Sequence, residues 1–129
     1  MHPTHRRGAS TEYKAAAYFA ERGWEVFWPP SGSSPCDFII SRKSETQKVQ
    51  VKTATIWTRS GSTYTRVRLG GKVLYKPGDF DLLVAWAPTD RLWVIPFEAL
   101  PDKTMIYLVK DGGAHAKTYG FDKYEVTDE

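Results

Sequence analysis

Two short apolar runs near the middle of the chain constrain its fold most strongly. Residues 38–40 follow directly on Asp37, and residues 48–52 alternate lysine and glutamine with valine. Alternation with a period of two is typical of a half-buried β-strand, because successive side chains point to opposite faces of a sheet. A short polar turn separates the two runs and lets them pair. We therefore expect Asp37, Gln50 and Lys52 to lie close together at one face of a sheet.

The rest of the pattern predicts one helix and several further strands. Ser10 and Thr11 can cap a helix from about residue 11 to residue 22, with Tyr13 and three alanines as its packing stripe. The fold class we expect is α+β, with a mixed or antiparallel sheet, the N-terminal helix on one face and a long basic β-hairpin. Strands are expected near residues 24–28, 37–40, 48–58, 63–69, 80–87, 92–97 and 105–109, and a short helix near 96–100.

Length and composition indicate one ordinary globular domain. The 129 residues are enough for a single modest core. We expect residues 1–7 to form a flexible tail and residues 8–129 to form the domain. No apolar run approaches the roughly 20 residues of a membrane helix, and Cys36 has no partner for an internal disulfide. These features favour a cytoplasmic protein without a membrane-bound form.

The charge is distributed unevenly along the chain. Residues 42–76 hold nine Lys or Arg and one acid, so this segment carries +8 although the whole chain carries +3. A basic block around a candidate site favours a polyanionic partner. A solvated hairpin that is basic only for solubility would give the same pattern.

The three polar residues suit phosphodiester hydrolysis with a bound metal ion. Mg²⁺ prefers hard oxygen ligands, usually one or two carboxylates with water and phosphate oxygens. Asp37 offers a carboxylate, Gln50 an amide oxygen and Val51 a main-chain carbonyl. Lys52 would place a compact positive charge against the phosphate or the attacking water.

Segments 35–37 and 50–52 together resemble the PD-(D/E)XK nuclease superfamily, which includes restriction enzymes, junction resolvases and some homing endonucleases. The resemblance implies a restriction-endonuclease-like core and Mg²⁺ as cofactor, with Mn²⁺ as a possible substitute. The chain departs from the superfamily pattern in two places: Cys36 separates the proline from Asp37, and Gln50 replaces the usual second acid. The loss of that acid should weaken metal binding.

The ordered motifs over residues 8–100 resemble one branch of the superfamily more closely. These motifs include an acid on the first helix, here Glu12, and the segments 75–81 and 92–96. The branch includes a homing endonuclease encoded in a cyanobacterial intron and also carries glutamine at the second-acid position. The resemblance implies site-specific cleavage of double-stranded DNA by a homodimer or homotetramer of bacterial or phage origin. The implied catalytic residues are Glu12, Asp37, Gln50 and Lys52.

Glu12 also has a purely structural explanation. Near a helix N-terminus an acid is stabilised by the helix dipole, whether or not it reaches a metal. Its position beside the other motifs favours the catalytic role.

The basic hairpin is the candidate DNA-binding element. A two-stranded ribbon fits the major groove, where arginine can contact guanine, and basic side chains can also follow phosphates without reading sequence. Trp57 and Tyr64 are expected near the hairpin end, where they could stack or pack between protomers. A solvated hairpin and a protomer interface stay open as alternatives. The candidate DNA-binding residues are Arg42, Lys43, Arg59, Arg66, Arg68 and Lys72.

Three other functions stay open from the sequence. The same site on a small basic protomer could belong to a Holliday junction resolvase. Gln50 would suit a non-catalytic DNA-binding module on a nuclease scaffold. An interaction domain without a nucleic-acid role is opposed by the +8 segment.

Overall fold

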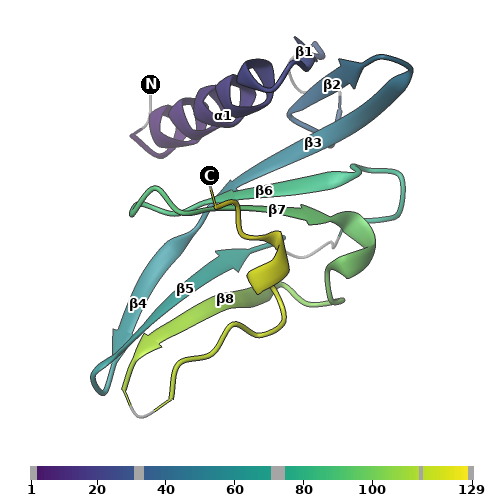
Figure 1. The fold of residues 1–129 in the computed structure, drawn as a ribbon. Helices are drawn as coiled ribbons and strands as arrows, with labels where there is room; N and C mark the ends of the chain where they lie inside the picture. Colours follow the sequence, from purple (N-terminus) through teal and green to yellow (C-terminus); the bar gives the residue numbers. More distant parts are fainter. Residues whose placement is uncertain (1–2, 31–33, 71–74, 114, 128–129) are drawn as a thin grey trace.

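One helix, a five-stranded sheet and a three-stranded sheet form three successive layers (Figure 1). The computed structural model describes residues 3–30, 34–70, 75–113 and 115–127. The α+β class, with the helix packed on a mixed sheet, is as predicted. The elements in chain order are α1 Pro3–Glu21, β1 Glu25–Phe27, β2 Phe38–Arg42, β3 Glu45–Thr53, β4 Thr55–Arg59, β5 Ser62–Arg68, β6 Leu82–Trp86, β7 Leu92–Pro96, the 3₁₀ turn η1 Phe97–Ala99, β8 Met105–Gly112 and the 3₁₀ turn η2 Asp122–Tyr124.

The larger sheet has the order β1-β2-β3-β6-β7, with β3 and β6 parallel and the other neighbours antiparallel. Parallel neighbours need a long crossover connection, and the β4–β5 hairpin lies within it. Asp81 fixes where the parallel pair begins. Its carboxylate accepts a hydrogen bond from the Lys48 main-chain N–H at 2.8 Å, and its own N–H donates to the Lys48 carbonyl at 2.9 Å.

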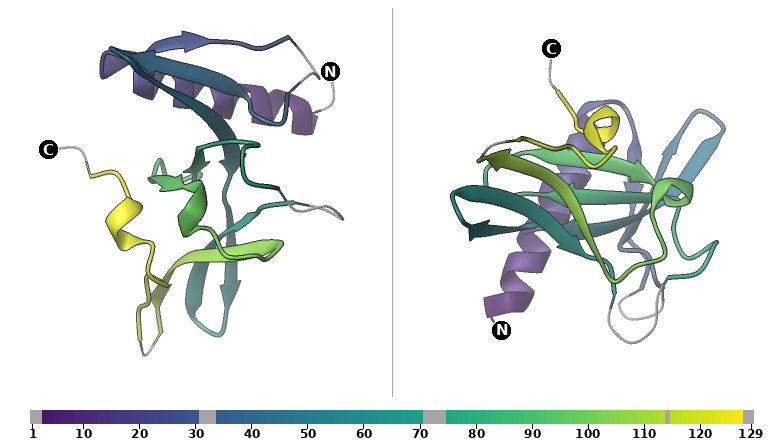
Figure 2. Two further views of the ribbon diagram at one scale, coloured as in Figure 1. Left: turned by 90° about the vertical axis from the view of Figure 1, so that its right-hand side faces the viewer. Right: turned by 90° about the horizontal axis from the view of Figure 1, so that it is seen from below.

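The chain changes sheets at Ala54, so the prediction of one continuous strand over residues 48–58 is wrong. β3 ends at Thr53 in the larger sheet, and β4 begins at Thr55 in the smaller sheet, of order β4-β5-β8. The Ala54 N–H donates to the Trp86 carbonyl at 2.8 Å, and its side chain is 1% exposed. A methyl group fits between the layers here, and no glycine or proline marks the break. Figure 2 shows the two sheets diverging from this point.

Helix α1 begins at Pro3 instead of near residue 11, and residues 3–7, which we expected to form a tail, are helical. Proline suits the first turn because its φ is already helical and its missing N–H would have no intrahelical partner. The glycine at position 8 costs the helix about 1 kcal/mol, which packing of the later turns can offset.

The buried face of α1 differs from the predicted stripe. Ala15, Ala16 and Phe19 are buried against the sheet, together with Thr11. Tyr13, expected on the packed face, is 67% exposed and leans on Trp28 with ring centroids 5.6 Å apart. The small alanine side chains allow the helix to approach the sheet closely, as the composition suggested.

Two apolar clusters join the three layers. The first lies between α1 and the larger sheet, and the second lies between the two sheets. On the helix side the sheet contributes Phe38, Ile40, Val49, Val51, Val84 and Leu92. On the other side it contributes Leu83, Ala85, Trp93 and Ile95, which pack on Val67, Ile106, Leu108 and Val109 of the smaller sheet.

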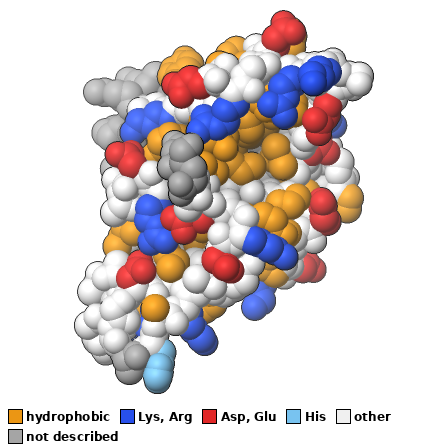
Figure 3. Space-filling view, in the orientation of Figure 1, with side chains coloured by type: hydrophobic (Ala, Val, Ile, Leu, Met, Phe, Trp, Pro, Cys, Tyr) orange, Lys and Arg blue, Asp and Glu red, His pale blue; other side chains and the backbone are white. Residues whose placement is uncertain are grey.

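A shallow groove of about 340 Å³ separates α1 from strands β6 and β7. Tyr18, Trp86, Leu92 and Val126 line it, and Lys14 lies 5.8 Å from the Trp86 ring centre. In Figure 3 acidic and basic side chains are interspersed on this face of the molecule. The basic block of the sequence therefore does not gather here as one positive patch. None of the helices in the described parts of the chain is long and apolar enough to cross a membrane.

Arg91 ties the C-terminal segment and the smaller sheet to the β6–β7 turn. Its guanidinium holds both oxygens of Glu125 at 2.8 Å and Asp111 at 3.2 Å. These groups are partly exposed, so the ion pairs stabilise the fold mainly through their bidentate geometry and not through a low local dielectric constant.

We expect Arg91→Lys to lower the free energy of unfolding by about 1 kcal/mol, because lysine cannot make the bidentate pair. Urea unfolding at low and high salt measures the loss, which should shrink as salt screens the pairs. Arg59→Lys, at an exposed hairpin position, is the matched control and should change stability little. Equal losses in the two variants would contradict the role of Arg91.

Candidate active site

Asp37 is held against the middle of β3 by two hydrogen bonds. Its main-chain N–H donates to the Val49 carbonyl at 2.8 Å, next to the last pair of the β2–β3 ladder. Its Oδ2 accepts the Val51 N–H at 2.7 Å. The carboxylate therefore occupies a fixed place beside the strand that carries Gln50 and Lys52.

Strand alternation sorts the residues of β3 as the sequence predicted. Val49 and Val51 face α1, while Gln50 and Lys52 face the opposite side, towards the smaller sheet. Gln50 is 7% exposed, so it lies in the interior. Its Nε2 is 3.5 Å from the Val51 carbonyl oxygen, at the limit of a hydrogen bond. The Lys52 Nζ lies 5.5 Å from the ring centre of Tyr75.

Glu12 reaches the same site from the helix. The hydroxyls of Thr11 and Thr53 are 2.9 Å apart, and this contact docks the turn that carries Glu12 on the end of β3. Since α1 begins at Pro3, Glu12 lies well inside the helix, beyond the first turn in which a helix dipole stabilises acids. The structural explanation of Glu12 as an N-terminal charge is therefore excluded.

The two carboxyl groups are destabilised in their charged forms. Burial raises the pKa of Asp37 above its ordinary value, and the Val51 N–H and the Lys52 charge only partly oppose this. Burial also raises the pKa of Glu12, and the neighbouring Asp37 charge raises it further. Residues far apart in the sequence thus form one electrostatically coupled group of two acids and one lysine.

The predicted DNA-binding residues fall in two regions. Arg42 and Lys43 lie at the far end of β2, roughly 17 Å along the strand from Asp37. The Arg42 guanidinium stacks on Trp24 at 4.2 Å and donates to the Arg22 carbonyl, so the structure does not bring it to the site. Arg59, Arg66 and Arg68 lie on the β4–β5 hairpin, and Lys72 lies outside the described residues.

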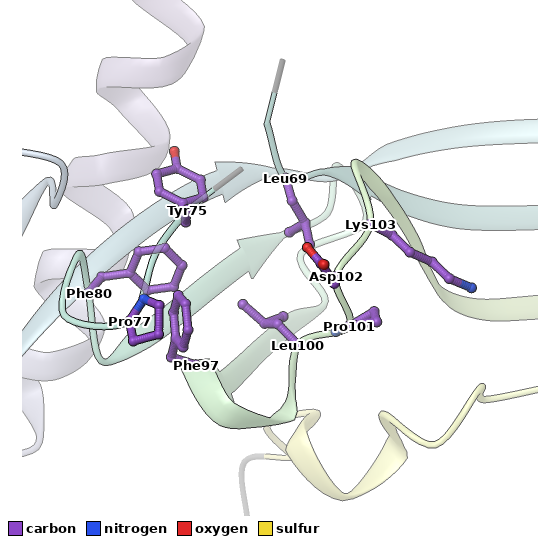
Figure 4. A pocket seen from close by; sticks show the side chains of 9 residues that line it. All are labelled: Leu69, Tyr75, Pro77, Phe80, Phe97, Leu100, Pro101, Asp102 and Lys103. Atoms are coloured by element: carbon purple, nitrogen blue, oxygen red, sulfur yellow. The ribbon is translucent and has the colours of Figure 1, made fainter. Parts of the chain in front are cut away.

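Tyr75 links the site to an apolar pocket of about 310 Å³ (Figure 4). Its ring meets Phe80 edge-on at 4.9 Å, and its hydroxyl points away from the pocket. Sequence reasoning missed Tyr75 as the neighbour of Lys52, because 23 positions separate the two residues and no local pattern joins them. The other lining residues are Leu69, Pro77, Phe97, Leu100, Pro101, Asp102 and Lys103.

Comparison with known proteins identifies the family to which this site belongs. The sequence model of the PD-(D/E)XK endonucleases matches residues 2–125. The chain belongs to the PD-(D/E)XK endonuclease family. The resemblance inferred from segments 35–37 and 50–52 is thereby confirmed.

Two further comparisons give a sequence relative and a structural neighbour. Protein 5.3 of Escherichia phage T7 is 33% identical over 112 residues, which cover 85% of this chain and 94% of the phage protein. The solved structure of the bacterial homing endonuclease I-Ssp6803I superposes with a TM-score of 0.78 at 20% identity, covering 96% of this chain and 89% of that one. The PD-(D/E)XK chain therefore shares the fold of that endonuclease.

The donor atoms of the PD-(D/E)XK site are hard oxygens, which fit Mg²⁺. Asp37 and Glu12 repel each other, and a bound cation would relieve this repulsion. The Val51 carbonyl and the Gln50 amide lie side by side, and the amide oxygen and nitrogen are interchangeable by rotation. Within the described residues, no three or more Asp, Glu, His or Cys side chains gather as a metal-binding group. The candidate metal ligands are therefore two carboxylates, supplemented by neutral oxygens.

We expect Asp37→Asn to stabilise the metal-free protein at neutral pH by up to about 1 kcal/mol. The raised pKa means that ionisation of Asp37 costs folding free energy above that pKa, and the cost disappears below the unfolded value of about 4. The gain should therefore shrink as the pH falls towards 4. Thermal melts in EDTA across this pH range provide the measurement.

The exposed Asp102→Asn is the control for this experiment and should show no comparable gain. A destabilised Asp37→Asn at neutral pH would show that the Val51 hydrogen bond outweighs the burial of charge.

Proposed function

We propose that this protein is a divalent-metal-dependent DNA endonuclease that hydrolyses phosphodiester bonds at specific sites in the manner of a homing endonuclease. The observation that carries the proposal is the coupled group of Glu12, Asp37 and Lys52 in a member of an endonuclease family. Two acids whose charged forms are destabilised lie beside a lysine. A cation and a phosphate together would stabilise this arrangement of charges.

The residues that would hold Mg²⁺ or Mn²⁺ are Asp37, Glu12, the Val51 carbonyl and the Gln50 amide oxygen. When bound, such an ion supplies Lewis-acid stabilisation of the phosphate and lowers the pKa of a coordinated water. The hydrogen bond from the Val51 N–H fixes one Asp37 oxygen and leaves the other for the ion. Burial of Gln50 limits the water around the site and so strengthens its electrostatic interactions.

Lys52 has the position and chemistry to stabilise charge on the scissile phosphate. Its ammonium lies 5.5 Å from the centre of the Tyr75 ring, and its charge partly opposes the raised pKa of Asp37. A positive charge whose place is fixed before the substrate binds stabilises the transition state without reorganisation. In this proposal Lys52 acts electrostatically, by stabilising charge on the phosphate.

Double-stranded DNA is the proposed substrate, and a homodimer or homotetramer is the proposed assembly. One protomer has one such site and would cut one strand, so a double-strand break needs two protomers. Exposed aromatic side chains beside the edge strand β1 support an additional protein contact: Phe27 is 52% exposed and Trp28 is 47% exposed.

We expect Lys52→Met and Asp37→Ala each to reduce plasmid nicking with Mg²⁺ or Mn²⁺ by about 10²-fold or more, and EDTA to abolish it. Lys52→Met removes the charge at the phosphate, and Asp37→Ala removes a metal ligand. Gel assays of supercoiled plasmid, linear duplex and four-way junction measure the loss and separate a homing-type nuclease from a junction resolvase.

Lys48→Met is the matched control, because Lys48 lies on the same face of β3 but donates to the Gly78 carbonyl at 2.9 Å, outside the site. It should cut at nearly the wild-type rate. Cleavage that survives Lys52→Met would overturn the proposal, as would metal-independent binding with no cleavage of any DNA.

Gln50→Glu tests whether this position contacts the metal. A third carboxylate should lower the Mg²⁺ concentration for half-maximal cleavage by about tenfold, because ligand charge governs affinity for hard cations. The same change should lower the melting temperature in EDTA, since it buries another negative charge beside Asp37. Magnesium titrations of cleavage and melts in EDTA measure the two effects, and an unchanged Mg²⁺ requirement would exclude Gln50 as a ligand position.

A further inference from the structure

The outer face of the three-stranded sheet carries aromatic and basic side chains and no acid. The inner face packs on the larger sheet, so the alternate side chains point away from the core. We call these outward residues, with two from the neighbouring segment 117–119, the cation–aromatic face. Its members are Trp57, Arg59, Tyr64, Arg66, Arg68, Tyr107, Lys110, Lys117 and Tyr119.

The four aromatic rings form a continuous row across the strands. Trp57 and Tyr64 are cross-strand partners with centroids 5.2 Å apart, and Tyr64 meets Tyr107 at 5.8 Å. Tyr107 meets Tyr119 at 5.9 Å, and Tyr119 is 40% exposed. Partial burial and then the neighbouring Tyr64 and Tyr107 raise the pKa of Tyr119, which agrees with clustered hydroxyl groups.

Basic groups alternate with these rings. The guanidinium carbons of Arg66 and Arg59 lie 4.7 and 5.9 Å from the centre of the Trp57 ring, and Lys117 Nζ lies 5.5 Å from the centre of Tyr119. Lys117 pairs with Lys110 through main-chain hydrogen bonds in both directions. Like charges thus stand side by side on a sheet, an arrangement that costs stability unless an anion is present.

These cations have no protein counterion in the part of the chain that the structure describes. Ion pairs lie elsewhere, between Arg91 and the carboxylates of Asp111 and Glu125. The Nε of Arg66 is buried and has no hydrogen-bond partner among the described residues, so one polar group of this face is unsatisfied in the free protein.

We infer that the cation–aromatic face binds an unpaired stretch of nucleic acid, with bases against the tyrosine and tryptophan rings and phosphates at the arginines and lysines. A surface that held only duplex phosphates would need cations alone, because the faces of paired bases are inaccessible. Aromatic rings interleaved with cations on a sheet are the means by which proteins hold single strands.

The inference adds a substrate feature to the proposed endonuclease. β4, which carries Trp57 and Arg59, continues within two residues from the strand that carries Lys52. The cation–aromatic face and the strand of the candidate active site are therefore joined by one short stretch of chain. The inference rests on the nucleic-acid substrate of the proposed function and does not require cleavage.

A binding assay under conditions that prevent cleavage tests this inference. The full chain with Lys52→Met, in EDTA, is titrated against a labelled single strand of about 16 nucleotides and against the matching duplex by fluorescence anisotropy. Tyr119→Asn removes a ring, and asparagine tolerates the left-handed backbone at this position, where φ is 54°. Its affinity for the single strand should fall about tenfold, and its affinity for the duplex should change less than about twofold.

Lys117→Gln is the second variant, and Lys123→Gln is its matched control. Each lysine lies over a tyrosine ring, at 5.5 Å for Lys117 and 5.3 Å for Lys123, but Lys123 lies on η2, away from the face. Lys117→Gln should weaken single-strand binding and lower the slope of log affinity against log salt by about one, whereas Lys123→Gln should leave both unchanged.

Equal losses on duplex and single strand, no loss in Tyr119→Asn, or identical effects of the two lysine variants would each overturn the inference. These outcomes are independent of the cleavage assay. Lost cleavage with retained single-strand binding would contradict only the proposed endonuclease, and the reverse result would contradict only the cation–aromatic face.

Discussion

The pairing of β3 on both of its edges is the constraint on which the rest of the structure depends. β2 fixes one edge and places Asp37 against Val51, while β6 fixes the other and sets the parallel register that begins at Asp81. One face of the strand packs on α1 and so determines that Gln50 and Lys52 point towards the other layer. A slip of one residue would exchange the two faces and bring the valines into the site.

The residues of the candidate site could be predicted from the sequence, but much of the structure around them could not. Alternation in β3 placed Gln50 and Lys52 together, and the short turn placed Asp37 beside them, because both signals are local. The burial of Gln50 depends on the packing of a second sheet, which no local pattern reports. The start of α1 was missed because Gly8 weakens the helical pattern there. Trp57, Tyr64 and the hairpin arginines of the cation–aromatic face were expected from the sequence. Tyr107 and Tyr119 were missed, because β8 and the segment that follows it lie beside the hairpin only after β5 and β8 pair.

The presence of glutamine at position 50 has a physical explanation in this site. Asp37 and Glu12 already resist ionisation, and a third carboxylate in a position that is 7% exposed would add to their repulsion. A neutral amide spares the free protein that cost. In the proposed metal site, it would attract a cation less strongly than a carboxylate and would leave the unliganded fold more stable.

The change of sheet at Ala54 separates the β4–β5 hairpin from the strand that carries Lys52. Ala54 is held in place by its burial and by the hydrogen bond from its N–H to the Trp86 carbonyl. Lys52 is fixed by the pairing of β3 with β6, on the other side of Ala54 from the turn. A change in the length of the left-handed turn at Ser60 and Gly61 would therefore leave this pairing intact. The length of the hairpin and the placement of Lys52 are set by separate parts of one continuous segment.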